Sequence, residues 1–265
     1  KSGEERLVDL LKAEQVGMSW RTGFALINQY TANNQWQQAV ETGKKYIKKY
    51  PSNYYIGLKY AKALCETGQY QPCISLLNKM QVLPNEGSYA GRAVYRAANL
   101  YQAMEQLSRK NYRQVMRNVE ASKEWPENLG VGKPYDDMID SRLEDYLEAK
   151  ALTGQGDNQK AATLLSSVAG YKTSRSRFGS GNLLTALALR ELGKEAEADR
   201  MVASWETDFP ENRITQWCAA VYRGEMEKAS GMLKSRNEQA DTTPWETSFR
   251  DSNFDLIVRL FSTAD

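Results

Sequence analysis

Residues 124–137, EWPENLGVGKPYDD, contain the group nearest to a chemical motif, Gly130-Val131-Gly132-Lys133. A phosphate-binding loop needs an earlier glycine, four intervening residues and then Gly-Lys-Ser/Thr, placed between a strand and a helix. Here no glycine stands at the required upstream place, and Lys133 is followed by Pro134, which has no amide to offer a phosphate. Nucleotide binding is therefore disfavoured, and Pro134 is better explained as standing near the first turn of a helix over 136–153.

Carboxylates are the next candidates for chemistry, and they occur as the neighbours Asp136-Asp137 and Glu144-Asp145. Adjacent residues point to different sides of a helix, so neither pair suits acid–base catalysis. Asp136 and Asp137 are instead expected to stabilise a helix N-terminus. The chain has no histidine, which excludes Ser-His-Asp and Cys-His catalysis and histidine-ligated zinc. A carboxylate-dependent glycosidase on an α/α toroid stays as a minor alternative, although that fold usually needs a longer chain.

Three cysteines and one basic loop complete the reactive residues. Cys65, Cys73 and Cys218 are too few for a disulfide framework, and small packing residues are the favoured interpretation. Cys65 and Cys73 could meet across a helical hairpin, and the sequence does not show whether they are bonded. The loop residues Lys172, Arg175 and Arg177 could contact an anionic partner, but a solvated loop is favoured. We expect no catalytic residue, no metal and no cofactor.

Composition limits the class of protein. The 265 residues carry 35 Lys and Arg against 33 Asp and Glu, a formal charge of +2, which argues against a dedicated nucleic-acid-binding protein. No apolar run is long enough to span a membrane. Because the first residue is Lys1, the sequence is interpreted as a processed protein or an excised fragment. A periplasmic or extracellular location after processing is left open, and the oligomeric state is not determined.

A turn followed three residues later by a small or compact residue recurs six times. The small residues are separated by 34, 42, 46, 37 and 31 positions. The six turns and the residues that follow them are Asn34-Gln35-Trp36 with Ala39, Gly68-Gln69-Tyr70 with Cys73, Lys110-Asn111-Tyr112 with Val115, Gly156-Asp157-Asn158 with Ala161, Gly193-Lys194-Glu195 with Ala198, and Gly224-Glu225-Met226 with Ala229.

Residues on both sides of these turns also recur. Twelve positions before the small residues stand Ile27, Ala61, Ala103, Ala149, Ala186 and Trp217. Small residues facing each other let two antiparallel helices approach closely. Eleven or twelve positions after four of the small residues stands a proline, which cannot continue a helix, namely Pro51, Pro84, Pro126 and Pro210. Each unit is thus predicted to be a helix, a tight turn, a second helix and a stop.

This set resembles the tetratricopeptide repeat (TPR) family, whose unit has ~34 residues. The aromatic residue after the turn matches at Trp36, Tyr70 and Tyr112, whereas the family's tryptophan near the start of the first helix is missing throughout. The resemblance covers roughly residues 18–236. It implies an all-α, right-handed superhelix (an α-solenoid) of about six helical hairpins.

One domain is expected over residues 1–265, with an N-terminal helix in 1–17, the repeats in 18–236, and a linker and capping helix in 237–265. Leu7, Leu10, Leu11 and Val16 form the apolar side of the first helix. Phe254, Ile257, Val258 and Phe261 form that of the last, after the N-cap cluster Asp251-Ser252-Asn253. Residues 85–91, 128–135 and 174–181 are expected to be loops, which in solenoids gather on one face.

A narrower resemblance rests on PENLGVGKPYDD and the following RLEDYLEAKALTGQGD. This segment is similar to the repeat region of large Bacteroidetes proteins whose front part is a domain of unknown function. The likeness implies a bacterial source and an upstream carbohydrate-associated domain. It makes an accessory structural module the alternative function.

The favoured function is a non-catalytic scaffold that binds a protein or peptide partner on the concave face of the superhelix. In the TPR family that face is lined by the first helix of each unit. Carrying the family's positions onto this chain places Arg21, Phe24, Asn28, Tyr55, Leu58, Lys62, Glu66, Tyr146, Lys150, Leu183 and Arg190 in the groove.

Overall fold

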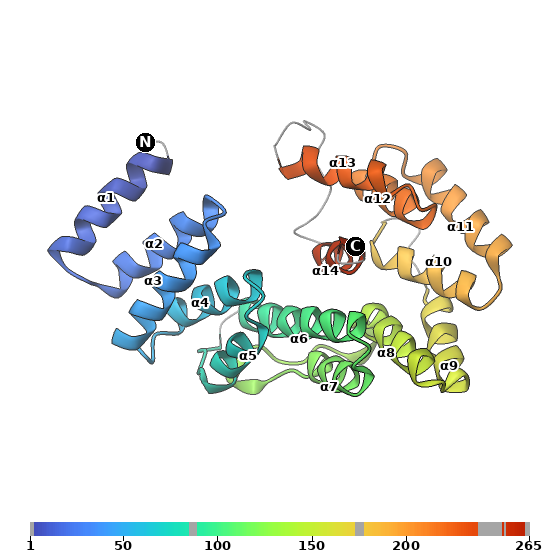
Figure 1. Cartoon of the computed structure of the whole chain (residues 1–265), viewed down its shortest axis with the longest axis horizontal. Coiled ribbons are helices and arrows are strands. Elements are labelled where there is room, and N and C mark those ends of the chain that lie inside the picture. The colour runs from blue at the N-terminus through green and yellow to red at the C-terminus, as the bar shows by residue number, and fades with distance from the viewer. Residues whose placement is uncertain (1–2, 85–88, 173–177, 238–250, 252, 263–265) are drawn as a thin grey trace. The chain divides into compact units, whose positions relative to one another are not determined.

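The computed structural model describes residues 3–84, 89–172, 178–237, 251 and 253–262, and the regular secondary structure of these residues is entirely helical, without a strand (Figure 1). The prediction of an all-α chain is confirmed for these residues. The α-helices are α1 (Gly3–Val16), α2 (Trp20–Ala32), α3 (Trp36–Lys49), α4 (Tyr54–Glu66), α5 (Tyr70–Lys79), α6 (Ala90–Ser108), α7 (Tyr112–Lys123), α8 (Arg142–Gln155), α9 (Asn158–Ala169), α10 (Gly181–Glu191), α11 (Glu195–Asp208), α12 (Arg213–Tyr222), α13 (Met226–Asn237) and α14 (Phe254–Ser262). Two short 3₁₀ helices, η1 (Glu127–Leu129) and η2 (Asp136–Met138), lie between α7 and α8.

All six turns predicted from the sequence share one backbone feature. The first residue of each has a positive φ, between 56° and 86°. Glycine tolerates this left-handed conformation because it has no Cβ, and it fills four of the six positions. The six residues are Asn34, Gly68, Lys110, Gly156, Gly193 and Gly224. The turns therefore reverse the chain in the same way, and neighbouring helices pack consecutively along the sequence.

The residues at the recurring positions around these turns are all buried. All six residues after the turns, and all six that precede them by twelve positions, are at most 2% exposed. One pair is in direct contact, because the thiol of Cys73 donates to the carbonyl of Ala61 at 3.1 Å. Trp217 is the one large aromatic residue in this set, and its ring packs against Phe254 and Phe261 of α14.

Close helix approach in the N-terminal part depends on glycine beneath a tyrosine ring. Tyr46 of α3 is fully buried, and a Cβ built on Gly23 of α2 would lie 2.2 Å from its ring. Tyr60 of α4 covers Gly43 of α3 in the same way, because a Cβ built on Gly43 would lie 2.5 Å from the Tyr60 ring. A side chain at either glycine would hold the helices apart.

By contacts the chain divides into two compact units. The first comprises Lys1–Gln102 and Ala121–Pro134, and the second comprises Ala103–Glu120 and Tyr135–Asp265, so the boundary cuts through α6 and α7. Within the first unit, α2 packs on α4 as well as on α3. Within the second, α10 packs on α8 and α12 as well as on its neighbours in sequence. The helices that precede the turns therefore contact one another inside each unit.

One of the segments that lengthen the predicted repeat, residues 128–135, lies against the chain that follows α5 in the first unit. The amide of Val82 donates to the carbonyl of Asn128 at 2.8 Å, and the Asn128 side-chain amide donates to the carbonyls of Leu77 and Met80. Gly130 has a φ of 73°, and a Cβ there would lie 2.9 Å from the Val82 carbonyl oxygen. The segment that resembles a phosphate loop is thus a packing joint beside the end of α5. Residues 85–88 of the other loop lie outside the described residues.

The predicted helix over 136–153 is wrong at its start. Asp136–Met138 form η2, and α8 begins only at Arg142. Asp140 sets this start, because its carboxylate accepts from the backbone amide of Arg142 at 3.2 Å and also binds its guanidinium. Asp140 therefore satisfies the start of the helix, a role that the sequence analysis gave to Asp136 and Asp137.

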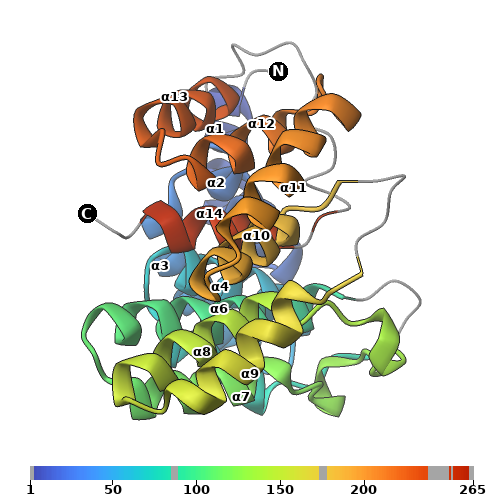
Figure 2. The same cartoon turned by 90° about the vertical axis from the view of Figure 1, so that its right-hand side faces the viewer.

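The C-terminal helix α14 is held by polar contacts as well as by its apolar side. Phe254, Leu256 and Ile257 are buried, and Figures 1 and 2 show α14 beside α10 and α12. The carboxylate of Asp251 accepts from the amides of Ser180 and Asn253. The expected linker after Asn237 lies outside the described residues. At the other end, Leu7 and Leu10 of α1 pack against the core of the first unit, while Leu11 and Val16 are exposed.

Candidate partner-binding surface

Aromatic rings on α2 and α4 form a connected surface in the first unit. The rings of Trp20 and Tyr55 are stacked with centroids 5.8 Å apart, and Phe24 meets Tyr55 edge-on at 6.3 Å. Tyr54 stacks on Tyr55 from the same helix at 4.2 Å. Tyr55 is 47% exposed, which makes it the ring of this group most open to solvent. The predicted residues Phe24 and Tyr55 are thus brought together.

Two cations, Arg21 and Lys59, lie against these rings, and a third, Lys62, is exposed on α4 near Lys59. The guanidinium carbon of Arg21 lies 4.6 Å from the Trp20 ring centroid, and the ammonium of Lys59 lies 5.4 Å from that of Phe24. Burial of Lys59, and secondarily the charge of Lys62, lower the pKa of the Lys59 ammonium. In the part of the chain that the structure describes, none of the three forms an ion pair with a carboxylate. We call Trp20, Arg21, Phe24, Tyr55, Lys59 and Lys62 the α2–α4 cluster.

An open depression between α1 and α2 adjoins this cluster at Phe24. Its volume is about 590 Å³, within the range of sites that take a small ligand. Apolar groups form most of its lining, and Arg6 and Asp9 of α1 contribute charge. The lining residues are Arg6, Asp9, Leu10, Phe24, Ala25, Asn28, Gln29 and Ala32.

The remaining predicted residues of the first unit have different environments. Asn28 lines the depression. Leu58 is half-buried against the core, and Glu66 is exposed at the end of α4. Lys59 and Trp20 were not predicted. Lys59 could have been found, since Tyr55, Lys59 and Lys62 are spaced to share one face of a helix.

In the second unit the predicted residues are engaged in internal contacts. The hydroxyl of Tyr146 donates to Glu191 at 2.6 Å, and the Lys150 ammonium pairs with the other oxygen of Glu191 at 3.1 Å. Burial, and secondarily the charge of Glu191, raise the pKa of Tyr146. Arg190 donates to the carbonyl of Tyr222 at 2.9 Å and covers its ring. Leu183 is fully buried, and the whole stretch of α10 from Gly181 to Leu189 is buried as well.

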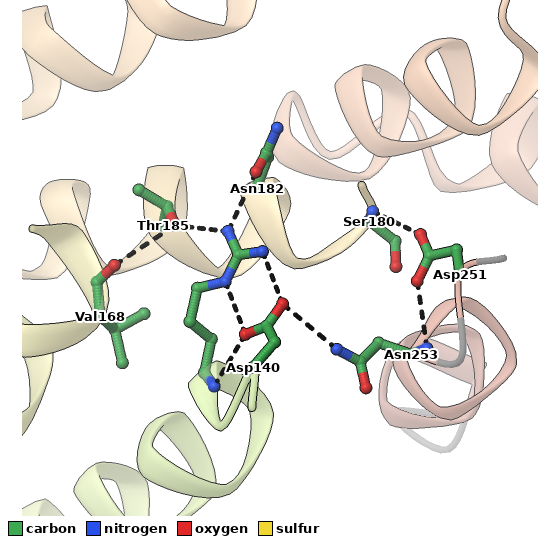
Figure 3. A network of polar contacts seen from close by, with 8 residues as sticks. Asp140, Val168, Ser180, Asn182, Thr185, Asp251 and Asn253 are labelled. Carbon is green, nitrogen blue, oxygen red and sulfur yellow. Dashed lines mark hydrogen bonds and ion pairs between the residues drawn. The ribbon is translucent and has the colours of Figure 1, made fainter. Parts of the chain in front are cut away.

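A buried polar network lies at the N-terminal ends of α8, α10 and α14 (Figure 3). The guanidinium of Arg142, 6% exposed, binds both oxygens of Asp140 at 2.9 and 2.7 Å. Its third nitrogen donates to Asn182 and Thr185 of α10. Asp140 also accepts from the side chain of Asn253 at 3.4 Å. Because the network satisfies its own charges, we interpret it as a structural lock between helices.

A second set of contacts holds α14 through an aromatic residue next to an acid. The ring of Phe254 packs edge-on against that of Trp217, with centroids 5.3 Å apart. The guanidinium carbon of Arg236 lies 5.2 Å from the centroid of the Phe254 ring. The adjacent Asp255 pairs with the same Arg236 at 2.9 Å. One arginine thus recognises both the ring and the carboxylate.

Other candidate chemistry is placed as follows. Asp136 and Asp137 are exposed on η2, and the thiols of Cys65, Cys73 and Cys218 are free and buried. Within the described ranges, no group of three or more acidic or thiol side chains could hold a metal ion. None of the helices in the described part of the chain combines the length and the apolar composition that a membrane span requires. Of the basic loop, Arg175 and Arg177 lie outside the described residues.

Comparisons with known proteins add no relative. No protein-family model matches the sequence, and no curated protein is significantly similar to it.

Proposed function

We propose that this chain is a TPR-like superhelix of about six helical hairpins that binds a protein or peptide partner without catalysing a reaction. Six turns of one backbone type support the repeat, together with the buried residues at the recurring positions around them. The contacts of α2 with α4, and of α10 with α8 and α12, are those expected when the first helices of successive hairpins line one face.

The observation that carries the proposal is the open α2–α4 cluster. Tyr55 and Lys62 are exposed on first helices, whereas α10 has a continuous buried stretch. Large aromatic side chains supply most of the binding energy at protein interfaces, and arginine is enriched there with them. A surface that combines exposed aromatic rings with cations lacking carboxylate partners is suited to bind an extended or helical segment.

The test is to select peptides from a random display library on the whole chain and to measure their affinity by calorimetry. We expect Tyr55→Ala to weaken binding roughly tenfold or more, because it removes the most open ring of the cluster. Lys44→Glu is the control, since Lys44 is exposed on α3, the second helix of its pair. The proposal is wrong if no peptide is enriched, or if Tyr55→Ala binds as tightly as the wild type.

A further inference from the structure

The contacts of α14 show which chemistry this chain uses to hold a helix. Phe254 occupies an aromatic and cationic site made by Trp217 and Arg236, and Asp255 neutralises the cation. Phe254 is 1% exposed, so the ring is fully inserted. An acid directly next to an aromatic anchor therefore satisfies both halves of such a site.

The first unit contains the same combination of aromatic rings and cations, but these cations lack a carboxylate partner among the described residues. Trp20 and Arg21 lie in contact, as do Phe24 and Lys59. The carboxylate that Asp255 supplies to Arg236 has no counterpart there among the described residues. Lys59 is half-buried, and holding an uncompensated cation in that place is unfavourable.

We propose that the α2–α4 cluster binds an acidic amphipathic segment of a partner protein, in which a side-chain carboxylate stands next to an aromatic or large aliphatic anchor. This inference rests on the proposed function and specifies its ligand. The carboxylate pairs with Lys59 and Lys62, and the anchor packs against the edge of the half-exposed Tyr55 ring. A second apolar side chain of the segment enters the depression that adjoins Phe24.

Charge complementarity selects this ligand over a nucleic acid or a sugar. Bases and sugar rings need an open aromatic face, but Arg21 and Lys59 cover faces of Trp20 and Phe24. Trp20 and Tyr55 also stack on each other, which uses a further pair of faces. The ring edges and the cations remain available, and these suit a carboxylate beside an apolar side chain.

The experiment uses the whole chain and two synthetic peptides that are blocked at both ends. The first is amphipathic, with Phe and Leu on one face, Asp and Glu on the other, and one Phe-Asp pair. The second has lysine at every acidic position. Fluorescence polarisation should detect binding of the acidic peptide only, weakening as salt is added. Because the ends are blocked, binding does not depend on a terminal carboxylate.

Lys59→Met tests the site, because methionine keeps an apolar stem over Phe24 and loses the charge. We expect it to weaken the acidic peptide roughly tenfold and to reduce the salt dependence, while Lys44→Met on α3 changes neither. Circular dichroism establishes that each variant is folded. Should Lys59→Met not fold, Lys62→Glu at an exposed position provides the same test.

The outcomes separate this inference from the proposed function. Equal binding of both peptides, or an unchanged affinity of Lys59→Met and Lys62→Glu, overturns the acidic ligand and leaves peptide binding in place. If neither these nor display-selected peptides bind, both proposals fail. Binding of single-stranded oligothymidylate that is lost in Lys59→Met would overturn the inference in favour of a nucleic-acid site.

Discussion

A single methyl group added at Gly23 should destabilise the first unit. In the Gly23→Ala variant the new Cβ would lie 2.2 to 2.6 Å from three ring atoms of Tyr46. Tyr46 is fully buried, and its ring also stacks on Tyr50, so it has little room to move. Either the ring or helix α2 must shift to accommodate the methyl group.

The size of the effect follows from two opposing terms. Overpacking a well-packed core costs about 1–3 kcal/mol, and the very short contact favours the upper end. Alanine in place of glycine inside a helix returns about 1 kcal/mol through its higher helix propensity. The expected net loss is therefore about 2 kcal/mol. At Gly231 of α13 a methyl group would meet no atom within 4 Å, so Gly231→Ala should gain about 1 kcal/mol.

Urea unfolding followed by circular dichroism measures both variants, with each transition fitted separately if the units unfold apart. A second check is Gly23→Ala combined with Tyr46→Leu, because removing the ring should relieve the clash and make the two changes less than additive. The prediction is wrong if Gly23→Ala is as stable as Gly231→Ala, or if the two changes in the double variant are strictly additive.

Three further predictions concern ionisable groups and thiols. Hydrogen bonds from Arg223 hold the pKa of Glu206 below its ordinary 4.5, so the pair stabilises the fold above pH 4.5 and loses this contribution as the pH falls further. In urea unfolding at a series of acid pH values, the free energy of unfolding of Glu206→Gln should therefore depend less on pH than that of the wild type. Asp140→Asn leaves the buried Arg142 guanidinium without its bidentate partner and should lower the free energy of unfolding by on the order of 3 kcal/mol. Adding Arg142→Met should recover part of this loss in the same assay. Burial should keep all three thiols unreactive toward an alkylating reagent until the protein is denatured, as mass spectrometry of labelled chains can show for Cys65, Cys73 and Cys218.

The features that the sequence predicts well depend on neighbours along the chain. Gly68 and Gly156 mark turns because a left-handed backbone favours glycine, and this preference is visible in any single turn. Asn34 carries that signal weakly and Lys110 does not carry it, so the recurring spacing was needed to identify their turns. Ala61 and similar residues were identified because close helix packing requires small side chains at fixed intervals from a turn.

The features that the sequence misses depend on partners far along the chain. Asp140 sets the start of α8 because its carboxylate is held by Arg142, whose remaining donors bind α10 some forty residues later. Glu191, which engages Tyr146 and Lys150, is likewise separated from them by 45 and 41 positions. A pattern carried over from a repeat family assigns positions to a face, but it does not show which positions the chain's own side chains already occupy. Leu183, buried with the rest of α10, illustrates this limit.

The joint between Val82 and Asn128 has a consequence for how this chain can vary among relatives. One backbone hydrogen bond joins the connection after α5 to the connection after α7, and the side chain of Asn128 caps the carbonyls at the end of α5. A deletion that moved either connection alone would leave these part-buried polar groups without their partners, so it should be tolerated only with a matching change in the other. The lengths of these two connections should therefore change together. A relative with the regular repeat spacing at one of them should have it at the other as well.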